Sequence, residues 1–281
     1  MQERAARRSA GIIARCACAA VAMVGLSCLS GCVTLAGRTA AATLPDRHGV
    51  VLDQLVVHSN FELPGQHRLL QELNAQRADL SIRLALPISD EPIHVYLFAD
   101  ADRFREFMNQ RHPTFPDRRA FFVETDTRLA VYAQWGDRVA EDLRHEVAHG
   151  YLHAVVQNLP LWLDEGLAEY FEVPRGTHGI NRPHIEELAA LAREGRWTPN
   201  LRRLETLQTP AQMSQAEYAE AWLWVHWLLE TEPPRRQLLQ TYLADLRRDA
   251  AVAPLSMYLR EHGGNAEAKL LAHLQALEEK R

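Results

Sequence analysis

The stretches RHEVAHGYLH, at residues 144–153, and LPLWLDEGLAEYFE, at residues 159–172, constrain the fold more than any other feature of this chain. Both carry apolar residues at helical spacing, so we expect two amphipathic helices joined by a short loop. His145 and His149 are four residues apart, and on a helix they project from one face about one turn apart. Two imidazoles at this separation can hold one metal ion. The following helix offers a third ligand within WLDEGLAEY.

The remaining segments predict strands first and helices afterwards. The expected order is a strand over 50–60, a helix over 67–86, a strand over 93–100, a helix over 101–110, and a pair of strands over 120–125 and 128–135. Helices are then expected over 138–157, 163–172, 184–195, 215–230, 235–249 and about 265–279. This order predicts an α+β fold with a small N-terminal sheet, followed by a mostly helical C-terminal half.

The first 31 residues have the pattern of a signal peptide. Four arginines precede the apolar run CACAAVAMVGLSCLSG, which is too short for a comfortable membrane span. The run ends in LSGC, residues 29–32, which resembles the lipobox of bacterial lipoproteins, where cleavage leaves the cysteine as a diacylated N-terminus. The resemblance implies a lipid anchor on Cys32. Because Val33 follows it, the resemblance also implies the outer membrane of a Gram-negative cell envelope, facing the periplasm. The alternative is a stray cysteine in an ordinary secretory signal.

Charge and cysteine content limit the classes of partner and the sources of stability. Removing residues 1–31 takes away four arginines and one glutamate, which changes the formal net charge from −5 to −8 and argues against nucleic acid as a partner. The mature chain keeps no disulfide, because all four cysteines lie at or before residue 32. Residues 32–47 are expected to be a tether, and residues 48–281 a single domain.

The pattern H-E-x-x-H assigns a second role within the first helix. Glu146 lies beside His145, and on helices with this pattern the glutamate does not bind the metal but acts as a general base toward water. A structural zinc site needs four protein ligands, whereas a catalytic site has three ligands and one open position. The number of protein ligands therefore distinguishes a structural from a catalytic site, and the next helix offers the third ligand.

H-E-x-x-H followed by LWLDEGLAEYFE resembles the gluzincin metallopeptidases, the thermolysin and aminopeptidase N superfamily, and especially its small peptidase MA-like members. In the aminopeptidases the glutamate of a W-L-N-E-G stretch is the third zinc ligand, and the matching residue here is Glu165. The resemblance thus implies a zinc-dependent peptidase in which His145, His149 and Glu165 bind Zn²⁺ and Glu146 activates water.

The spacing of the third ligand departs from the larger families. Fifteen residues separate His149 from Glu165, where those families have about eighteen or nineteen, and Glu169 stands at the thermolysin-like interval. We choose Glu165 because the surrounding residues match it and because a loop between helices can shorten. Glu169, one turn further along, is then expected to accept the spare ring N–H of a histidine ligand. The alternative for both is a solvated charge on an amphipathic helix.

Three further residues are candidates for roles near the site. The aminopeptidases use a tyrosine that opens a later helix to stabilise the oxyanion, and the comparable residue here is Tyr218, although Glu220-Ala221 replaces the Lys-Gly of that family. A simple core tyrosine is the alternative. His226 could serve instead, but packing among the nearby tryptophans is favoured for it. His153 is expected to be a partly buried structural histidine.

The substrate of the implied peptidase is a peptide or protein. The strand over 128–135 is expected at the edge of the sheet, where a substrate peptide could add as a further strand. Nothing in the sequence resembles the G-x-M-E-N stretch with which aminopeptidases recognise a free N-terminus, so internal cleavage is favoured. Two other hypotheses stay open: a non-enzymatic envelope lipoprotein that uses a peptidase-like fold for binding or assembly, and a structural metal site without an open position.

Overall fold

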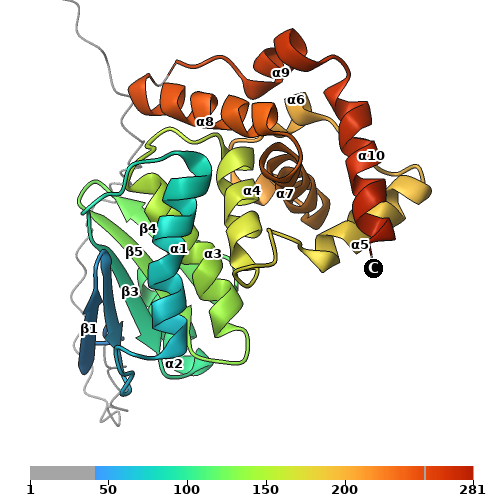
Figure 1. Ribbon diagram of the computed structural model, residues 1–281. Helices are drawn as coiled ribbons and strands as arrows, with labels where there is room; N and C mark the ends of the chain where they lie inside the picture. Colours follow the sequence, from blue (N-terminus) through green and yellow to red (C-terminus); the bar gives the residue numbers. More distant parts are fainter. Residues whose placement is uncertain (1–41, 250, 281) are drawn as a thin grey trace, which may run out of the picture. The chain divides into compact units, whose positions relative to one another are not determined.

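The computed structural model describes residues 42–249 and 251–280, apart from the side chains of residues 262 and 263. Cys32 and the expected signal peptide lie outside this part. The fold is α+β, as predicted, with a five-stranded sheet followed by a mostly helical half (Figure 1). The strands are β1 (His48–Leu52), β2 (Leu55–Ser59), β3 (Ile93–Phe98), β4 (Ala120–Thr125) and β5 (Arg128–Gln134).

Helices form in all the segments where they were expected. The helices of the sheet half are α1 (Arg68–Leu84), α2 (Ala101–Arg111) and α3 (Val139–His153). Those that follow are α4 (Leu161–Glu172), α5 (Arg182–Arg193), α6 (Leu201–Leu204), the 3₁₀ helix η1 (Pro210–Gln212), α7 (Gln215–Glu230), α8 (Pro233–Arg248), α9 (Leu255–Gly263) and α10 (Ala266–Glu279). The three short helices α6, η1 and α9 were not expected. None of the described helices is long and apolar enough to cross a bilayer.

The sheet has the strand order β1-β2-β3-β5-β4, which corrects two sequence predictions. The segment over 128–135 was expected at the edge, but β5 lies inside the sheet and β4 is the edge strand. Five consecutive residues of β5 are buried, which is the pattern of a strand covered on both faces. The segment over 50–60 forms two antiparallel strands, because the backbone turns at Asp53, whose φ of 48° is in the left-handed region that Asp tolerates.

Helices cover both faces of the sheet. On one face α1 and α3 pack their leucines and valines against β3 and β5 in the main hydrophobic core. On the other face Phe104, Phe107 and Met108 of α2 pack against Phe98 and Tyr132. Ala42 and Leu44 also pack against this second cluster, so the last residues of the expected tether lie on the sheet.

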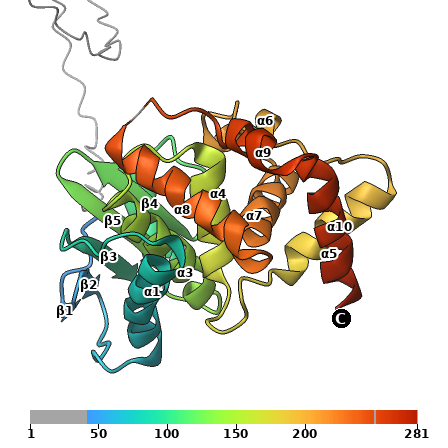
Figure 2. The same ribbon diagram turned by 45° about the horizontal axis from the view of Figure 1, so that its top comes forward.

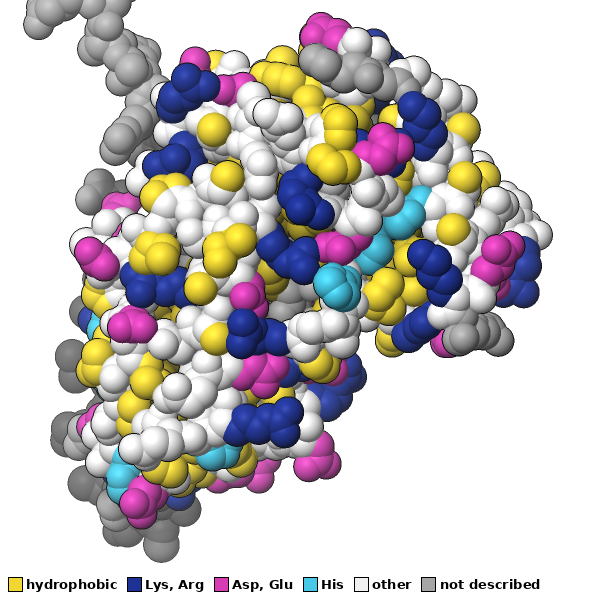
Figure 3. All heavy atoms as spheres, in the orientation of Figure 1, with side chains coloured by type: hydrophobic (Ala, Val, Ile, Leu, Met, Phe, Trp, Pro, Cys, Tyr) yellow, Lys and Arg dark blue, Asp and Glu magenta, His cyan; other side chains and the backbone are white. Residues whose placement is uncertain are grey.

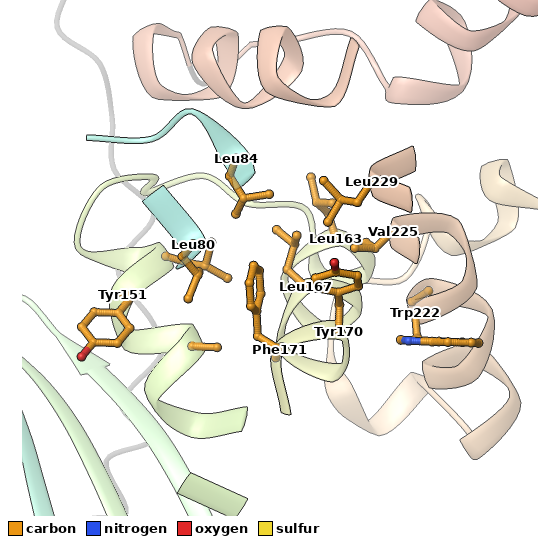
Figure 4. Packing of buried hydrophobic residues seen from close by; sticks show 14 of the residues in the cluster. Leu80, Leu84, Tyr151, Leu163, Leu167, Tyr170, Phe171, Trp222, Val225 and Leu229 are labelled. Atoms are coloured by element: carbon orange, nitrogen blue, oxygen red, sulfur yellow. The ribbon is translucent and has the colours of Figure 1, made fainter. Parts of the chain in front are cut away.

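Helix α4 lies between the two halves of the molecule. Figure 4 shows Leu163, Leu167, Tyr170 and Phe171 of α4 between the side chains of α1 and α3 on one side and those of α7 on the other. Figure 2 shows the same order of helices from a second direction. Every residue that α4 presents to a polar site is therefore held by packing on two sides.

A glycine lets α4 and α7 approach closely. A Cβ atom added at Gly166 would lie 2.6 Å from the carbonyl oxygen of Ala221, which is closer than such atoms can come. The residue after Glu165 must therefore be glycine for the two helix backbones to touch here. This contact fixes the position of the carboxylate that precedes it.

Candidate metal centre

The three predicted ligands converge at the interface of α3 and α4. Nε2 of His145 and Nε2 of His149 lie 3.2 Å apart, and Oε2 of Glu165 lies 3.6 Å from the first and 3.7 Å from the second. A point equidistant from three atoms at these separations lies about 2.0 Å from each, which is the length of Zn–N and Zn–O bonds in proteins. These groups could hold a metal ion.

The carboxylate oxygen of Glu165 that faces the two imidazoles accepts no hydrogen bond within the described structure. Oε2 of Glu165 is buried and has no hydrogen-bond partner there. A buried carboxylate oxygen without a partner is costly, and a cation at the centre of the three atoms would remove that cost. The residues present therefore fit a divalent cation.

Two carboxylates orient the histidine rings from behind. Nδ1 of His145 lies 3.1 Å from Oε2 of Glu172, and Nδ1 of His149 lies 2.8 Å from Oδ1 of Asp164. Each ring therefore donates through Nδ1 and presents Nε2 to the centre, which is the usual arrangement behind histidine ligands.

The structure corrects the role expected for Glu169. Its Oε2 lies 2.7 Å from Nε2 of His184, a buried residue on α5. Glu169 therefore bonds to His184 and not to a ring nitrogen of His145 or His149. The expected position is taken by Glu172, which lies seven residues after Glu165, two turns along the same helix. The i, i+7 spacing was visible in the sequence, but it does not tell which of two carboxylates on that face reaches the imidazole.

The electrostatics of the site favour a positive charge. Burial lowers the pKa of both imidazoles, but the carboxylates of Glu165 and Glu172 raise the pKa of His145 well above its usual value. Asp164 and Glu165 likewise raise the pKa of His149. Burial raises the pKa of Asp164, yet the two histidines that it contacts bring it far below its usual value. An environment in which carboxylates raise the pKa of two buried imidazoles also suits a divalent cation.

Glu146 lies between the centre and the edge strand. Its Oε2 accepts a hydrogen bond of 2.7 Å from the backbone N–H of Phe122 in β4. Burial raises the pKa of Glu146, although the nearby His145 and His149 lower it. The carboxylate lies beside the three converging groups and is not one of them.

Tyr218 lies at the site, together with an arginine that sequence reasoning missed. Nη2 of Arg118 lies 3.3 Å from the hydroxyl of Tyr218, and both residues line a cavity with His145 and Glu146. Among the described residues Arg118 forms no ion pair, whereas its neighbour Arg119 pairs with Asp142. No motif pointed to Arg118, because the loop before β4 has no periodicity that predicts where its side chains lie.

The two other candidate histidines have different surroundings. His153 is partly buried and bonds to Oδ2 of Asp164, at 3.0 Å, and to Oε2 of Glu124, at 2.6 Å. It therefore supports the residue that orients His149. Nδ1 of His226 lies 2.9 Å from Nε2 of His273 on α10, and the ring packs against Trp222. His226 thus lies in the helical half and does not take the place of Tyr218.

Comparison with known sequences gives a match to one family over part of the chain. Residues 139–251 match the family described as "Protein of unknown function (DUF1570)". This range begins at the first residue of α3 and includes all three converging groups. No curated protein matches the chain. The part of the chain that is similar to DUF1570 is thus the part that holds the candidate metal centre.

Proposed function

We propose that this protein is a zinc-dependent peptidase that cleaves internal peptide bonds. The observation that carries the proposal is the triangle formed by two imidazole nitrogens and one otherwise unpartnered carboxylate oxygen, with a second carboxylate, that of Glu146, beside it. Three ligands leave one coordination position open, which distinguishes a catalytic from a structural zinc site. Zinc bound there would lower the pKa of a water molecule and polarise a carbonyl group.

Glu146 is the proposed general base. Its carboxylate accepts a proton from the attacking water and returns it to the amine that leaves. The raised pKa of Glu146, which burial causes, brings its basicity closer to what proton transfer near neutral pH requires. The N–H of Phe122 holds one carboxylate oxygen, so the other is directed away from the strand.

Tyr218 and Arg118 are the proposed donors to the carbonyl oxygen. As the carbonyl is attacked, negative charge develops on its oxygen, and preorganised donors stabilise that charge. The phenol and the guanidinium are hydrogen-bonded to each other and face the same cavity as Glu146. Because Arg118 has no carboxylate partner in the described structure, its charge is available to a ligand.

The edge strand is the proposed docking site for the peptide backbone. The N–H of Phe122 points away from β5, toward Glu146, so the N–H and C=O groups of alternate β4 residues face the same side. A peptide in extended conformation can pair with such an edge, and this places one of its carbonyl groups near Glu146.

We also propose that the mature chain is anchored to the membrane of the cell envelope through lipid on Cys32. The support is the lipobox-like LSGC at residues 29–32. Two acyl chains give effectively stable attachment. The described residues begin at residue 42, ten positions after that cysteine, so a short segment would connect the anchor to the domain.

The test uses the mature chain with Cys32→Ser, which keeps it soluble. We expect about one zinc per chain by metal analysis, and cleavage of members of a peptide library that chelation stops and zinc restores. Glu146→Gln is expected to bind zinc as the parent does and to lose hydrolysis by two orders of magnitude or more. Full activity in this variant would refute the proposed base. Zinc without turnover of any peptide would favour the non-enzymatic alternative.

A further inference from the structure

Two cavities of different chemistry meet at Arg118, His145 and Glu146. The first has a volume of about 540 Å³, and charged side chains line it: Arg105, Arg119, Glu141, Asp142, Glu169 and Glu172. The second has a volume of about 810 Å³, and its wall away from the converging groups is mostly apolar: Phe115, Pro116, Phe121, Phe122, Leu161 and Met213.

The apolar wall is built from four separate parts of the chain. It joins the loop before β4, the edge strand itself, the first residue of α4, and the end of η1 with the residue that follows. The rings of Phe115 and Phe121 lie 5.1 Å apart, and the ring of Phe122 stacks on that of His149 at 5.9 Å. The apolar surface therefore extends to one of the converging imidazoles.

This cavity is open to solvent and is not part of the core. Phe115 is 38% exposed, which makes it one of the few exposed large hydrophobic side chains in the part of the chain that the structure describes. An apolar surface beside polar groups is the usual composition of a ligand site, and the volume lies in the range of such sites. An apolar group that enters displaces water from this surface, which is favourable.

We infer that the apolar cavity binds a bulky apolar side chain of the substrate, adjacent to the bond that is cleaved. The charged cavity then receives the chain on the other side of that bond, where polar residues find partners. This assignment rests on the proposed peptidase function, and it adds the substrate class: peptides with a large apolar residue on one side of the cleavage site and polar residues on the other.

The inference is tested with peptides that differ at one position only, with Leu, Phe, Ala, Asn or Asp next to the cleavage site. Cleavage positions are read by mass spectrometry. We expect kcat/KM for Leu and Phe to exceed that for Asn and Asp by about tenfold or more. The Glu146→Gln variant gives a readout without turnover, and it should bind the Leu peptide about tenfold more tightly than the Asn peptide in calorimetry.

Phe115 allows a sharp variant, because an exposed side chain can be replaced without loss of the core. Phe115→Asp is expected to reduce the preference for Leu over Asn about tenfold, and Phe115→Ser to reduce it less. The matched control is Ile82→Asp on α1, which is 77% exposed and lines neither cavity, so its selectivity should equal that of the parent. Circular dichroism and thermal unfolding check that each variant is folded.

The outcomes separate this inference from the proposed function. Cleavage of apolar and polar peptides at equal rates, or unchanged selectivity in Phe115→Asp, would overturn the inference and leave the peptidase function standing. Selective binding of apolar peptides without cleavage of any would support the cavity and refute the peptidase function. Neither binding nor cleavage would overturn both.

Discussion

Asp164 contacts the His149 ring through one carboxylate oxygen, with Oδ1 2.8 Å from Nδ1. Its other oxygen lies 3.0 Å from His153, so the carboxylate has a partner on each side. The residue next to Glu165 thus orients the ring of His149. Adjacent residues on a helix point about 100° apart, which is why neighbouring acids can serve two different partners.

Asp164→Asn is expected to weaken zinc binding by about ten- to a hundredfold, because the amide holds the His149 ring less firmly in the required tautomer. The measurement is competition with a chromogenic chelator. Asp79→Asn is the matched control, since Asp79 pairs with Arg175 at the surface and not with an imidazole. A zinc affinity equal to that of the parent would contradict the proposal that Asp164 positions His149 for metal binding.

Zinc is expected to stabilise the parent against unfolding but not Glu165→Gln. A ligand that binds only the folded state at a concentration 100 times its Kd adds about 2.7 kcal/mol. Loss of the carboxylate charge removes one of three ligands, so the stabilisation should shrink to a small fraction. Denaturant titrations with zinc and with chelator measure it. Glu186→Gln, an exposed change on α5, should respond to zinc as the parent does.

Gly166→Ala is expected to destabilise the fold by about 1–3 kcal/mol, because the added methyl group meets the backbone of α7 and not a side chain that could move. Displacement of α4 should also weaken zinc binding. Thermal unfolding of the chelator-treated protein isolates the first effect. Gly136→Ala is the control, since a Cβ there has no neighbour within 4 Å. Equal stability of both variants would contradict the close contact of α4 and α7.

Arg118→Gln and Tyr218→Phe are each expected to lower kcat by about a hundredfold, with smaller changes in KM, because both act on charge that develops during the reaction. The double variant should lose much less than the product of the two effects, since the two groups are hydrogen-bonded. Arg103→Gln, an exposed change on α2, provides the comparison. Fully multiplicative losses would show that the two donors act separately.

The stability of the protein should fall in acid through His226 and His273. Burial and the neighbouring His273 lower the pKa of His226 to about 3, and burial with Lys280 and Arg235 lowers the pKa of His273 to about 4, although Glu230 opposes the shift in His226. Unfolded histidines titrate near 6.5, so the unfolded chain binds more protons as the pH falls from about 6.5 to 4. The contribution of this pair is complete above about pH 6.5 and is lost progressively as the pH falls, down to about 4 for His273 and about 3 for His226.

The measurement is the free energy of unfolding between pH 7 and pH 4. His226→Gln with His273→Gln should flatten the slope by about 2 kcal/mol per pH unit, because each histidine contributes at most about 1.4 kcal/mol per pH unit. The control is His48→Gln, because His48 is an exposed residue of β1, away from this pair. On the face drawn in Figure 3, histidine, basic and acidic side chains lie close together between the sheet half and the C-terminal helices. An unchanged slope in the double variant would contradict the role of the buried pair.

The sequence predicted α3 and α4 well, because the patterns that specify these two helices are local in the chain. The spacing of His145 and His149 sets one face of α3, and the residues around Glu165 set one face of α4. Apolar periodicity was also enough to predict most helices, since a helix buries a stripe that recurs along the chain. The choice of Glu165 over Glu169 came from neighbouring residues and agrees with the geometry.

What the sequence could not predict depends on contacts between distant segments. The pairing of β3 with β5 placed the last strand inside the sheet and left β4 at its edge, and a hairpin pattern alone does not decide this order. Arg118 reaches Tyr218 across 100 residues of chain. The partner of Glu169 is likewise His184, on a helix whose position follows from packing against α7.

The loop between α3 and α4, residues 154–160, carries none of the three converging groups. Packing of the two helix faces, and not the length of this connection, sets where Glu165 meets the imidazoles. Insertions and deletions in this loop would therefore be tolerated, and the number of residues between His149 and Glu165 can vary among related chains. A sequence search for metal centres of this type should therefore match the residue patterns of two consecutive helices and allow any number of residues between them.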